Sequence, residues 1–238
     1  MRNISLEDLL ASGAHFGHMT SNWDPNMAEY IFTEKNGVHI IDLYKTIEQL
    51  NKAIELVSET VKKGGSILFV ATKKAAKTVV EEEADRCGMF HVTERWLGGT
   101  LTNFMTIKKS IKRLHLLEKD DTSGVADTLT KKEMLMRNRE RIRLETQHRG
   151  IKDMRRLPDV VIVVDAKKES IAIAEALRLE IPIIAVVDSN TDPRKVDIPI
   201  PANDDSIQAV RLLMSTLADA IMESKGISKV IETEEVTA

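Results

Sequence analysis

The sequence contains little cysteine, few aromatic residues and no long apolar run. Its 238 residues include one cysteine, Cys87, which excludes an intramolecular disulfide and fits a reducing compartment. The longest apolar runs, such as residues 181–187 with their proline, are far too short to span a bilayer. The first ten residues carry acids and lack the apolar core of a signal peptide. We therefore expect a cytoplasmic protein with no membrane segment.

Motifs that hold the phosphates of a nucleotide are also missing. No G-x-G-x-x-G follows an expected strand, and no G-x-x-x-x-G-K-[ST] occurs. Gly64 and Gly65 precede an apolar run instead of following one, which is the wrong side for a phosphate-binding turn. No residue argues for a nucleotide, so we expect no cofactor.

What the sequence does contain is a concentration of positive charge between residues 131 and 156. Ten Lys or Arg stand there against four acids, a surplus of six, whereas the whole chain carries −3 and the remainder therefore −9. Ion pairs at four-residue spacing, Glu133 with Arg137 and Glu145 with Arg149, account for part of the surplus. They leave unexplained Arg139, Arg141, Arg143, Lys152, Arg155 and Arg156. Charge gathered in this way favours a nucleic-acid partner over a merely solvated helix face.

Short β-branched runs alternate with helical periods over most of the chain. The runs predict strands at residues 38–41, 67–71, 89–93, 160–164 and 183–187, and the apolar spacing predicts helices after them, among them 73–87, 169–179 and 206–222. Asp204 and Asp205 suit the start of the last helix. This alternation indicates an α/β fold with a doubly wound parallel sheet of about five strands.

Residues 101–150 do not follow this rhythm. Ile107, Ile111 and Leu114 form one helical stripe, and Thr130 with a Glu three residues later is typical of a capping box that starts a second helix. Gly150 is expected to end it. We therefore predict an antiparallel helical hairpin at 101–150, inserted into a body formed by 1–100 and 151–223 and followed by a mobile acidic tail at 224–238.

Two kinds of residue suggest a catalytic or metal site instead. Asp165 and Asp188 each end an expected strand, where paired carboxylates can hold a metal ion or transfer protons. This is the alternative hypothesis: a metal-dependent α/β enzyme acting on a phosphorylated small molecule. Histidines at residues 15, 18, 39 and 91 and the thiol of Cys87 could bind a metal if they converged, but their spacing is a weak signal. We expect no metal and no catalysis.

Four of the few aromatic residues lie near glycine, proline or basic residues and not in strand centres: Phe16, Trp23, Trp96 and Phe104. Exposed rings of this kind stack on unpaired bases or fill pockets on a partner. The alternative is that each ring fastens a loop to the hydrophobic core. The sequence leaves both readings open.

Five motifs, HFGH, RWLGGTLTNF, LPD, VVDSNTDP and IPANDD, lie in residues 15–46, 69–107 and 157–207. Together they resemble the bacterial S-two protein family of the small ribosomal subunit. The resemblance implies a flavodoxin-like sheet with an inserted helical hairpin and a structural, non-catalytic role in the cytoplasm. It also implies binding to small-subunit ribosomal RNA and to neighbouring ribosomal proteins, including the S-one protein that it helps to dock, and gives no reason to expect a homo-oligomer.

Transferred position by position, the resemblance implies RNA contacts by His15, Phe16, Gly17, His18, Trp23 and Pro25, by Thr72, Lys73 and Lys74, and by Arg95, Trp96, Leu97, Gly98, Gly99, Thr102 and Asn103. The hairpin adds Lys108, Lys109, Lys112, Arg113, Arg137, Arg139, Arg141 and Arg143, followed by Arg155. Lys73 and Lys74 open a helix, so their ammoniums and backbone N–H groups suit one phosphate, and Arg95 suits a bidentate contact. Gly98 and Gly99 allow either close approach to RNA or a tight connection.

The chain departs from the family pattern at two places. Ser21, Asn22 and Asn26 stand where basic residues are usual, so phosphate contacts from that loop are in doubt. His148-Arg149-Gly150 replaces a usual Gly-Gly pair, so the end of the hairpin is expected to differ in geometry.

Overall fold

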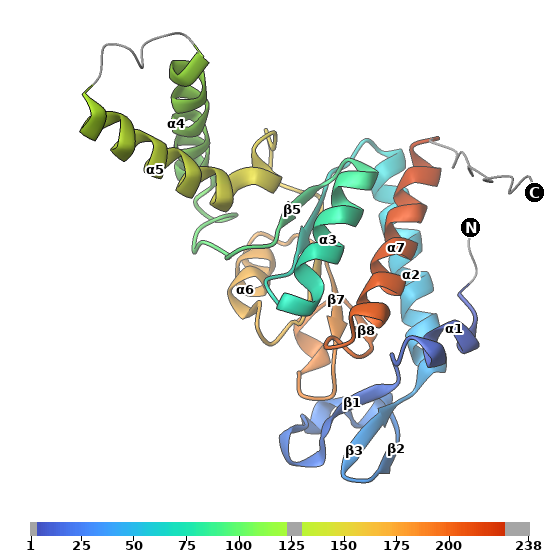
Figure 1. Ribbon diagram of the computed structural model, residues 1–238. Helices are drawn as coiled ribbons and strands as arrows, with labels where there is room; N and C mark the ends of the chain where they lie inside the picture. Colours follow the sequence, from blue (N-terminus) through green and yellow to red (C-terminus); the bar gives the residue numbers. More distant parts are fainter. Residues whose placement is uncertain (1–3, 123–129, 227–238) are drawn as a thin grey trace, which may run out of the picture.

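A five-stranded parallel sheet forms the centre of the computed structural model, which describes residues 4–122 and 130–226 (Figure 1). Its order is β5-β4-β6-β7-β8. The strands are β4 (Ile67–Val70), β5 (Phe90–Val92), β6 (Val160–Val164), β7 (Ile183–Val187) and β8 (Ile198–Pro201). Counted along the sheet, this is the order 2-1-3-4-5 of flavodoxin-like folds, which confirms the predicted doubly wound architecture.

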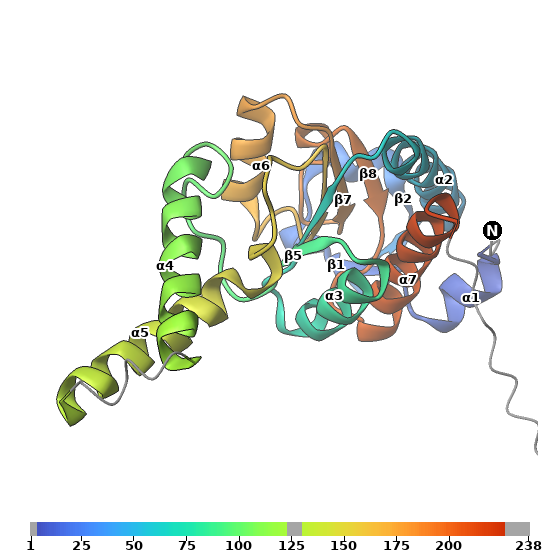
Figure 2. The same cartoon turned by 90° about the horizontal axis from the view of Figure 1, so that it is seen from above.

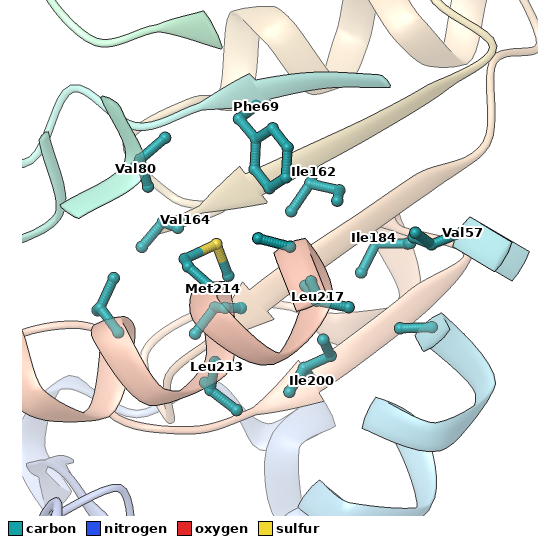
Figure 3. Packing of buried hydrophobic residues seen from close by; sticks show 14 of the residues in the cluster. Val57, Phe69, Val80, Ile162, Val164, Ile184, Ile200, Leu213, Met214 and Leu217 are labelled. Atoms are coloured by element: carbon teal, nitrogen blue, oxygen red, sulfur yellow. The ribbon is translucent and has the colours of Figure 1, made fainter. Parts of the chain in front are cut away.

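Helices cover both faces of this sheet. One face carries α2 (Leu43–Lys62), α3 (Lys74–Cys87) and α7 (Ile207–Ser224), and the other carries α6 (Ser170–Arg178) with the base of α4 (Phe104–Thr122). Figure 3 shows Met214 and Leu217 of α7 against Phe69, Ile162 and Ile184 of the sheet. The intervening strand residues are buried on the opposite face. Burial on both faces explains why these strands are continuous apolar runs. No helix in the described ranges is long and apolar enough to cross a membrane.

The fifth strand of the sheet is β8, which we did not predict. This segment contains Pro199 and Pro201, and proline is uncommon in strands because it lacks a backbone N–H to donate to a neighbouring strand. It pairs with β7 alone, through backbone groups such as the N–H of Ala202, which donates to the carbonyl of Val187. A proline is tolerated at a sheet edge, because its missing N–H costs no bond on the open side.

Residues 38–41, predicted as one of the parallel strands, instead form β3 (Val38–Ile41) of a separate antiparallel sheet. Its order is β1-β3-β2, with β1 (Phe16–Met19) and β2 (Ile31–Lys35). Asn36 and Gly37 join β2 to β3 with φ of 55° and 77°, the conformation of the commonest two-residue hairpin turn. The prediction was wrong because it overlooked this Asn-Gly signal. Short helices complete this end of the molecule: α1 (Leu6–Ala11), η1 (Thr20–Asn22) and η2 (Pro25–Tyr30).

Two long helices, α4 and α5 (Lys131–His148), project from the body (Figures 1 and 2). The predicted capping box is present: the Thr130 hydroxyl accepts from the Glu133 N–H, and the Glu133 carboxylate accepts from the Thr130 N–H. Leu114 and Leu117 of α4 pack against Leu144 of α5 as a small separate core. Most of the tail predicted at 224–238 lies outside the described residues.

Gly150 does not end α5 as predicted. The helix ends at His148, Arg149 keeps right-handed helical angles, and the chain continues into η4 (Arg149–Ile151). A Cβ on Gly150 would overlap the carbonyl oxygen and the ring of His91, which is buried within β5. The glycine is therefore required by the close approach of the hairpin to the sheet edge, not by a left-handed helix end.

Candidate nucleic-acid interface

The hairpin carries exposed cations that form no ion pair with the described residues, although Arg143 adds to the effect of Arg113 in lowering the pKa of Glu140. Among the residues that the structure describes, no ion pair involves the exposed side chains of Lys109, Lys112, Lys131, Lys132, Arg139 and Arg143. Lys132, Arg139 and Arg143 are spaced by seven and four residues, so they share one face of α5. We call all six of these lysine and arginine residues, on α4 and α5, the hairpin cations. Exposed apolar side chains, among them Leu135 and Ile142, lie on the same helix.

Other basic residues of the hairpin are engaged within the protein. The Arg113 guanidinium donates to both carboxylate oxygens of Glu140, at 3.1 and 2.9 Å, and this contact lowers the pKa of Glu140. Arg141 pairs with Glu145 at 3.1 Å, and the Lys108 ammonium lies 4.8 Å from the centre of the Phe104 ring. Internal pairing therefore accounts for part of the charge. The half-buried Arg137 lies on the same side of α5 as Arg141, whereas Arg155, beyond η4, is exposed.

Lys73 lies among carboxylates at the end of β4. Its Nζ is 2.7 Å from Asp204, 2.6 Å from Asp205 and 3.8 Å from Asp165. Asp204 is buried, and burial together with nearby Asp188 raises its pKa to about 7. These acids do not cap α7 as expected, because the Ser206 hydroxyl accepts the Ala209 N–H instead. A phosphate at Lys73 would have to compete with three carboxylates, whereas the neighbouring Lys74 is exposed and without an ion pair in the described ranges.

A protein carboxylate occupies the position where a doubly wound sheet ordinarily binds an anion. The Thr72 N–H donates to Glu169 at 3.0 Å, and the Thr72 hydroxyl donates to the same oxygen. Asp165 accepts from the Lys168 N–H at 3.0 Å. At this edge of the sheet, the donor groups of Thr72 and Lys168 are thus already bound by the chain's own carboxylates.

His18 faces the carboxylate cluster. Its Nδ1 lies 3.0 Å from Asp188, and this hydrogen bond raises the pKa of His18. Ligand atoms of His18, Asp188 and Asp204 lie within 4.8 Å of one another, a donor set able to hold a divalent cation such as zinc. In the described part of the chain, the other histidines and Cys87 do not join such a group. Cys87 is buried, and burial raises the pKa of its thiol to about 11, as expected for an inert core residue.

One side chain that we did not predict, Glu175 of α6, organises the loop between β5 and α4. Its carboxylate accepts hydrogen bonds from Trp96 Nε1 at 3.0 Å, from the Thr102 hydroxyl at 3.1 Å, and from the backbone N–H groups of Gly99, Leu101 and Thr102. Trp96 is only 7% exposed, so it fastens this loop to α6 and offers little surface to a base. A single acid among the buried alanines and isoleucine of α6 was the signal that could have revealed it.

The remaining residues of this loop differ in exposure. Gly99 has a φ of +89°, which requires a glycine, while Gly98 faces open space. The carbonyl of exposed Asn103 accepts from the backbone N–H groups of Thr106 and Ile107 in α4. Arg95 is exposed and has no ion pair within the described residues, so it is available to a phosphate.

The segment around β1 is partly closed off and partly exposed. Gly17 approaches Ser189 so closely that a Cβ would lie 2.8 Å from its hydroxyl, and burial lowers the pKa of His15. Phe16 is 49% and Trp23 is 38% exposed. Ser21 and Asn22 are exposed in η1, and the Asn26 N–H is bound by the Asp24 carboxylate.

Substitutions of Lys73 and Lys74 are expected to separate structural from binding roles. Lys73→Met leaves acids in the cluster uncompensated, and we expect it to lower the free energy of unfolding by about 2 kcal/mol. Lys74→Met is expected to leave stability unchanged and to weaken nucleic-acid affinity several-fold. Chemical denaturation and a filter-binding titration measure the two effects. A stable Lys73→Met protein with lost affinity would show that Lys73 contacts the nucleic acid directly.

Residues 9–224 match the family model described as Ribosomal protein S2. The matched segment contains the parallel sheet, both hairpin helices and the carboxylate cluster around Lys73.

Proposed function

The chain belongs to the ribosomal protein S2 family, as its sequence motifs predicted. We propose that it binds ribosomal RNA chiefly through the hairpin cations. Family membership makes the chain a structural, RNA-binding component of the small ribosomal subunit, in the cytoplasm, with a role in translation. What the family does not specify is which of its surfaces carry the contact.

The observation that carries the proposal is the set of exposed cations on α4 and α5 that form no ion pair within the described residues. Lysine and arginine side chains that lack internal partners release counterions from a polyanion when they bind it, and that release drives association. An apolar core between α4 and α5 gives the face a defined shape, which suits recognition of folded RNA through its backbone.

The body adds secondary contacts in this proposal. Residues 1–100 and 151–223 form the RNA-binding body, into which 101–150 is inserted as the hairpin. Lys74 and Arg95, both exposed, supply phosphate contacts there. Trp96 and Thr102 act indirectly, because Glu175 uses them to hold the loop that carries Arg95.

Neighbouring small-subunit proteins, including the S-one protein, are proposed to bind the antiparallel sheet. Met19 of β1 is 64% exposed and Phe32 of β2 is 73% exposed. Large apolar side chains exposed at one end of a domain are typical of contact with another protein. We propose that the chain enters the subunit as a single copy.

The enzyme hypothesis has weaker support. Asp165 caps Lys168 and lies beside Lys73, and Asp188 is bound to His18, so neither carboxylate faces an open crevice. We therefore propose that the chain is not catalytic, in keeping with the structural role of its family.

The salt dependence of RNA affinity tests the proposal. If about five phosphates are neutralised, affinity for small-subunit ribosomal RNA should fall on the order of a thousandfold for each tenfold rise in salt. Titration of the full chain with this RNA at graded potassium concentrations measures the slope. An RNA affinity that does not change with salt concentration would show that the cations do not bind phosphates.

A further inference from the structure

A groove beside α6 is not explained by the hairpin or the carboxylate cluster. It encloses about 530 Å³ between α6, the loop that contains Trp23 and the loop before η5 (Pro193–Lys195). This volume lies in the range of small-molecule sites in proteins. Its wall is apolar, formed by Ala166, Ile173, Ala174 and Leu177.

Trp23 supplies an aromatic surface at this groove. Its side chain is 38% exposed, and its ring is held at a tilt against the ring of His39, with centroids 5.0 Å apart. Contact with His39 restricts the indole before any ligand arrives, so little conformational entropy is lost on stacking. The other tryptophan of the chain is buried and bonded to Glu175, so Trp23 alone offers this surface.

The rim of the groove carries positive charge, part of which acts on Asp192: Arg194 and, to a smaller extent, Lys195 lower the pKa of that carboxyl. Lys167 and Lys195 are exposed, and neither has an ion pair in the portion of the chain described. The acids of the rim are engaged: Asp192 binds Arg194 at 3.2 Å, and Asp24 accepts the Asn26 N–H at 2.9 Å. A ligand with an apolar ring and an anionic group fits this combination better than an apolar side chain does.

We propose that the groove receives an unpaired nucleotide of the ribosomal RNA, with its base stacked on Trp23 and its flanking phosphates held by Lys167 and Lys195. The exposed Asn22 amide, at the same rim, offers hydrogen bonds to a base edge. The inference deepens the proposed function and rests on it. It also gives Asn22 a role at a position where the family usually has a basic residue.

Tryptophan fluorescence of the full chain tests this site. The probes are a single-stranded adenine ribo-oligonucleotide of about six nucleotides and an RNA duplex of equal length. The single strand should quench Trp23 emission in a Trp96→Phe protein, and the duplex should not. Trp23→Ala should weaken single-strand affinity roughly tenfold, while Trp23→Phe, which keeps a ring, should retain most of it.

The lysines are tested by the salt slope. Lys167→Gln with Lys195→Gln should lower the slope for the single strand by about 1.4, at roughly 0.7 for each lost phosphate contact. Lys62→Gln with Lys63→Gln removes the same net charge at the end of α2, away from the groove, and is the control; of these two lysines, Lys63 pairs with Glu59 at 3.5 Å. An unchanged slope in the groove variant would overturn the assignment of these two lysines.

The outcomes separate this inference from the proposed function. If the single strand fails to quench Trp23 while ribosomal RNA still binds with its steep salt dependence, the groove is not a nucleotide site and the hairpin function stands. If Leu177→Asp displaces a neighbouring protein from reconstituted subunits without changing oligonucleotide affinity, the groove docks a protein and the inference is overturned. If ribosomal RNA itself does not bind, the proposed function fails.

Discussion

Replacing Glu175 with alanine is expected to lower the free energy of unfolding by about 3–5 kcal/mol, because several buried donors lose one shared acceptor. The Trp96 indole N–H and the backbone N–H groups of the following loop all point at this carboxylate. Each donor left without a partner costs about 1–3 kcal/mol, and water can satisfy only those nearest the surface. The expected loss is large for a single substitution.

Urea denaturation of the variant and the parent chain measures this loss. Arg178→Ala is the matched control, since Arg178 is exposed on the same helix and has no ion pair among the described residues. It should change stability by less than about 0.5 kcal/mol. A Glu175→Ala chain within about 1 kcal/mol of the parent would mean that the loop does not depend on this carboxylate.

The contribution of Glu175 should also depend on pH. Burial alone would raise the pKa of Glu175, but hydrogen bonds from Thr102, Trp96, Gly99 and Leu101 outweigh it and lower the pKa below its usual value. The folded chain therefore binds this proton less readily than the unfolded chain does. Its stabilising effect is present above the unfolded pKa, about 4.3, and is lost as pH falls through the lower folded pKa. The difference between parent and variant should shrink accordingly in acid denaturation.

Reversing two of the hairpin cations is expected to have the largest effect on RNA binding. Arg139 and Arg143 lie four residues apart on α5, exposed and without ion pairs in the described ranges. Arg139→Glu with Arg143→Glu should lower affinity for small-subunit ribosomal RNA on the order of a hundredfold at moderate salt, since each phosphate contact contributes roughly a tenfold factor there. Arg141 is left intact because it pairs with Glu145 within the helix.

Co-sedimentation with small subunits and filter binding measure this change. Lys62→Glu with Lys63→Glu makes the same alteration of net charge at the end of α2, and it should reduce affinity only slightly. Thermal unfolding shows whether the hairpin variant remains folded, as expected for exposed positions. Should both double variants bind equally, net charge alone governs affinity. Should the hairpin variant bind like the parent, Lys74 and Arg95 would be the principal contacts.

Local sequence patterns predicted most of the strands of the fold but not the sheet to which each strand belongs. The buried runs at β4, β6 and β7 were predicted correctly because their signals are local and strong. The predicted number of strands in the parallel sheet was nevertheless correct only because one wrongly included strand offset one missed strand. Residues 38–41 belong to another sheet, and β8 was missed. Apolar content alone does not say which sheet a strand joins, although Asn36-Gly37 gave a local signal for the hairpin.

The candidate site was predicted less completely than the fold. The local surplus of basic residues indicated the hairpin cations, because a helix with many more basic than acidic residues must leave some of its cations without an ion pair. It did not reveal that Arg113 is bound to Glu140 or that Lys73 is surrounded by acids from segments more than ninety positions away. Two of these acids, Asp204 and Asp205, directly precede the last expected helix, where capping of that helix was the simpler interpretation.

The sequence by itself determined four of the five parallel strands (β4, β5, β6 and β7), the two hairpin helices and the family, because hydrophobic periodicity, caps and motifs act over a few neighbouring residues. Only the tertiary structure decided which of the described cations form ion pairs within the protein and which do not. It also decided that Glu175 holds the Trp96 loop and that Trp23 faces a groove. The physical reason is that residues distant along the chain determine whether a charged group is paired or an aromatic ring is buried. Tertiary packing brings those residues together.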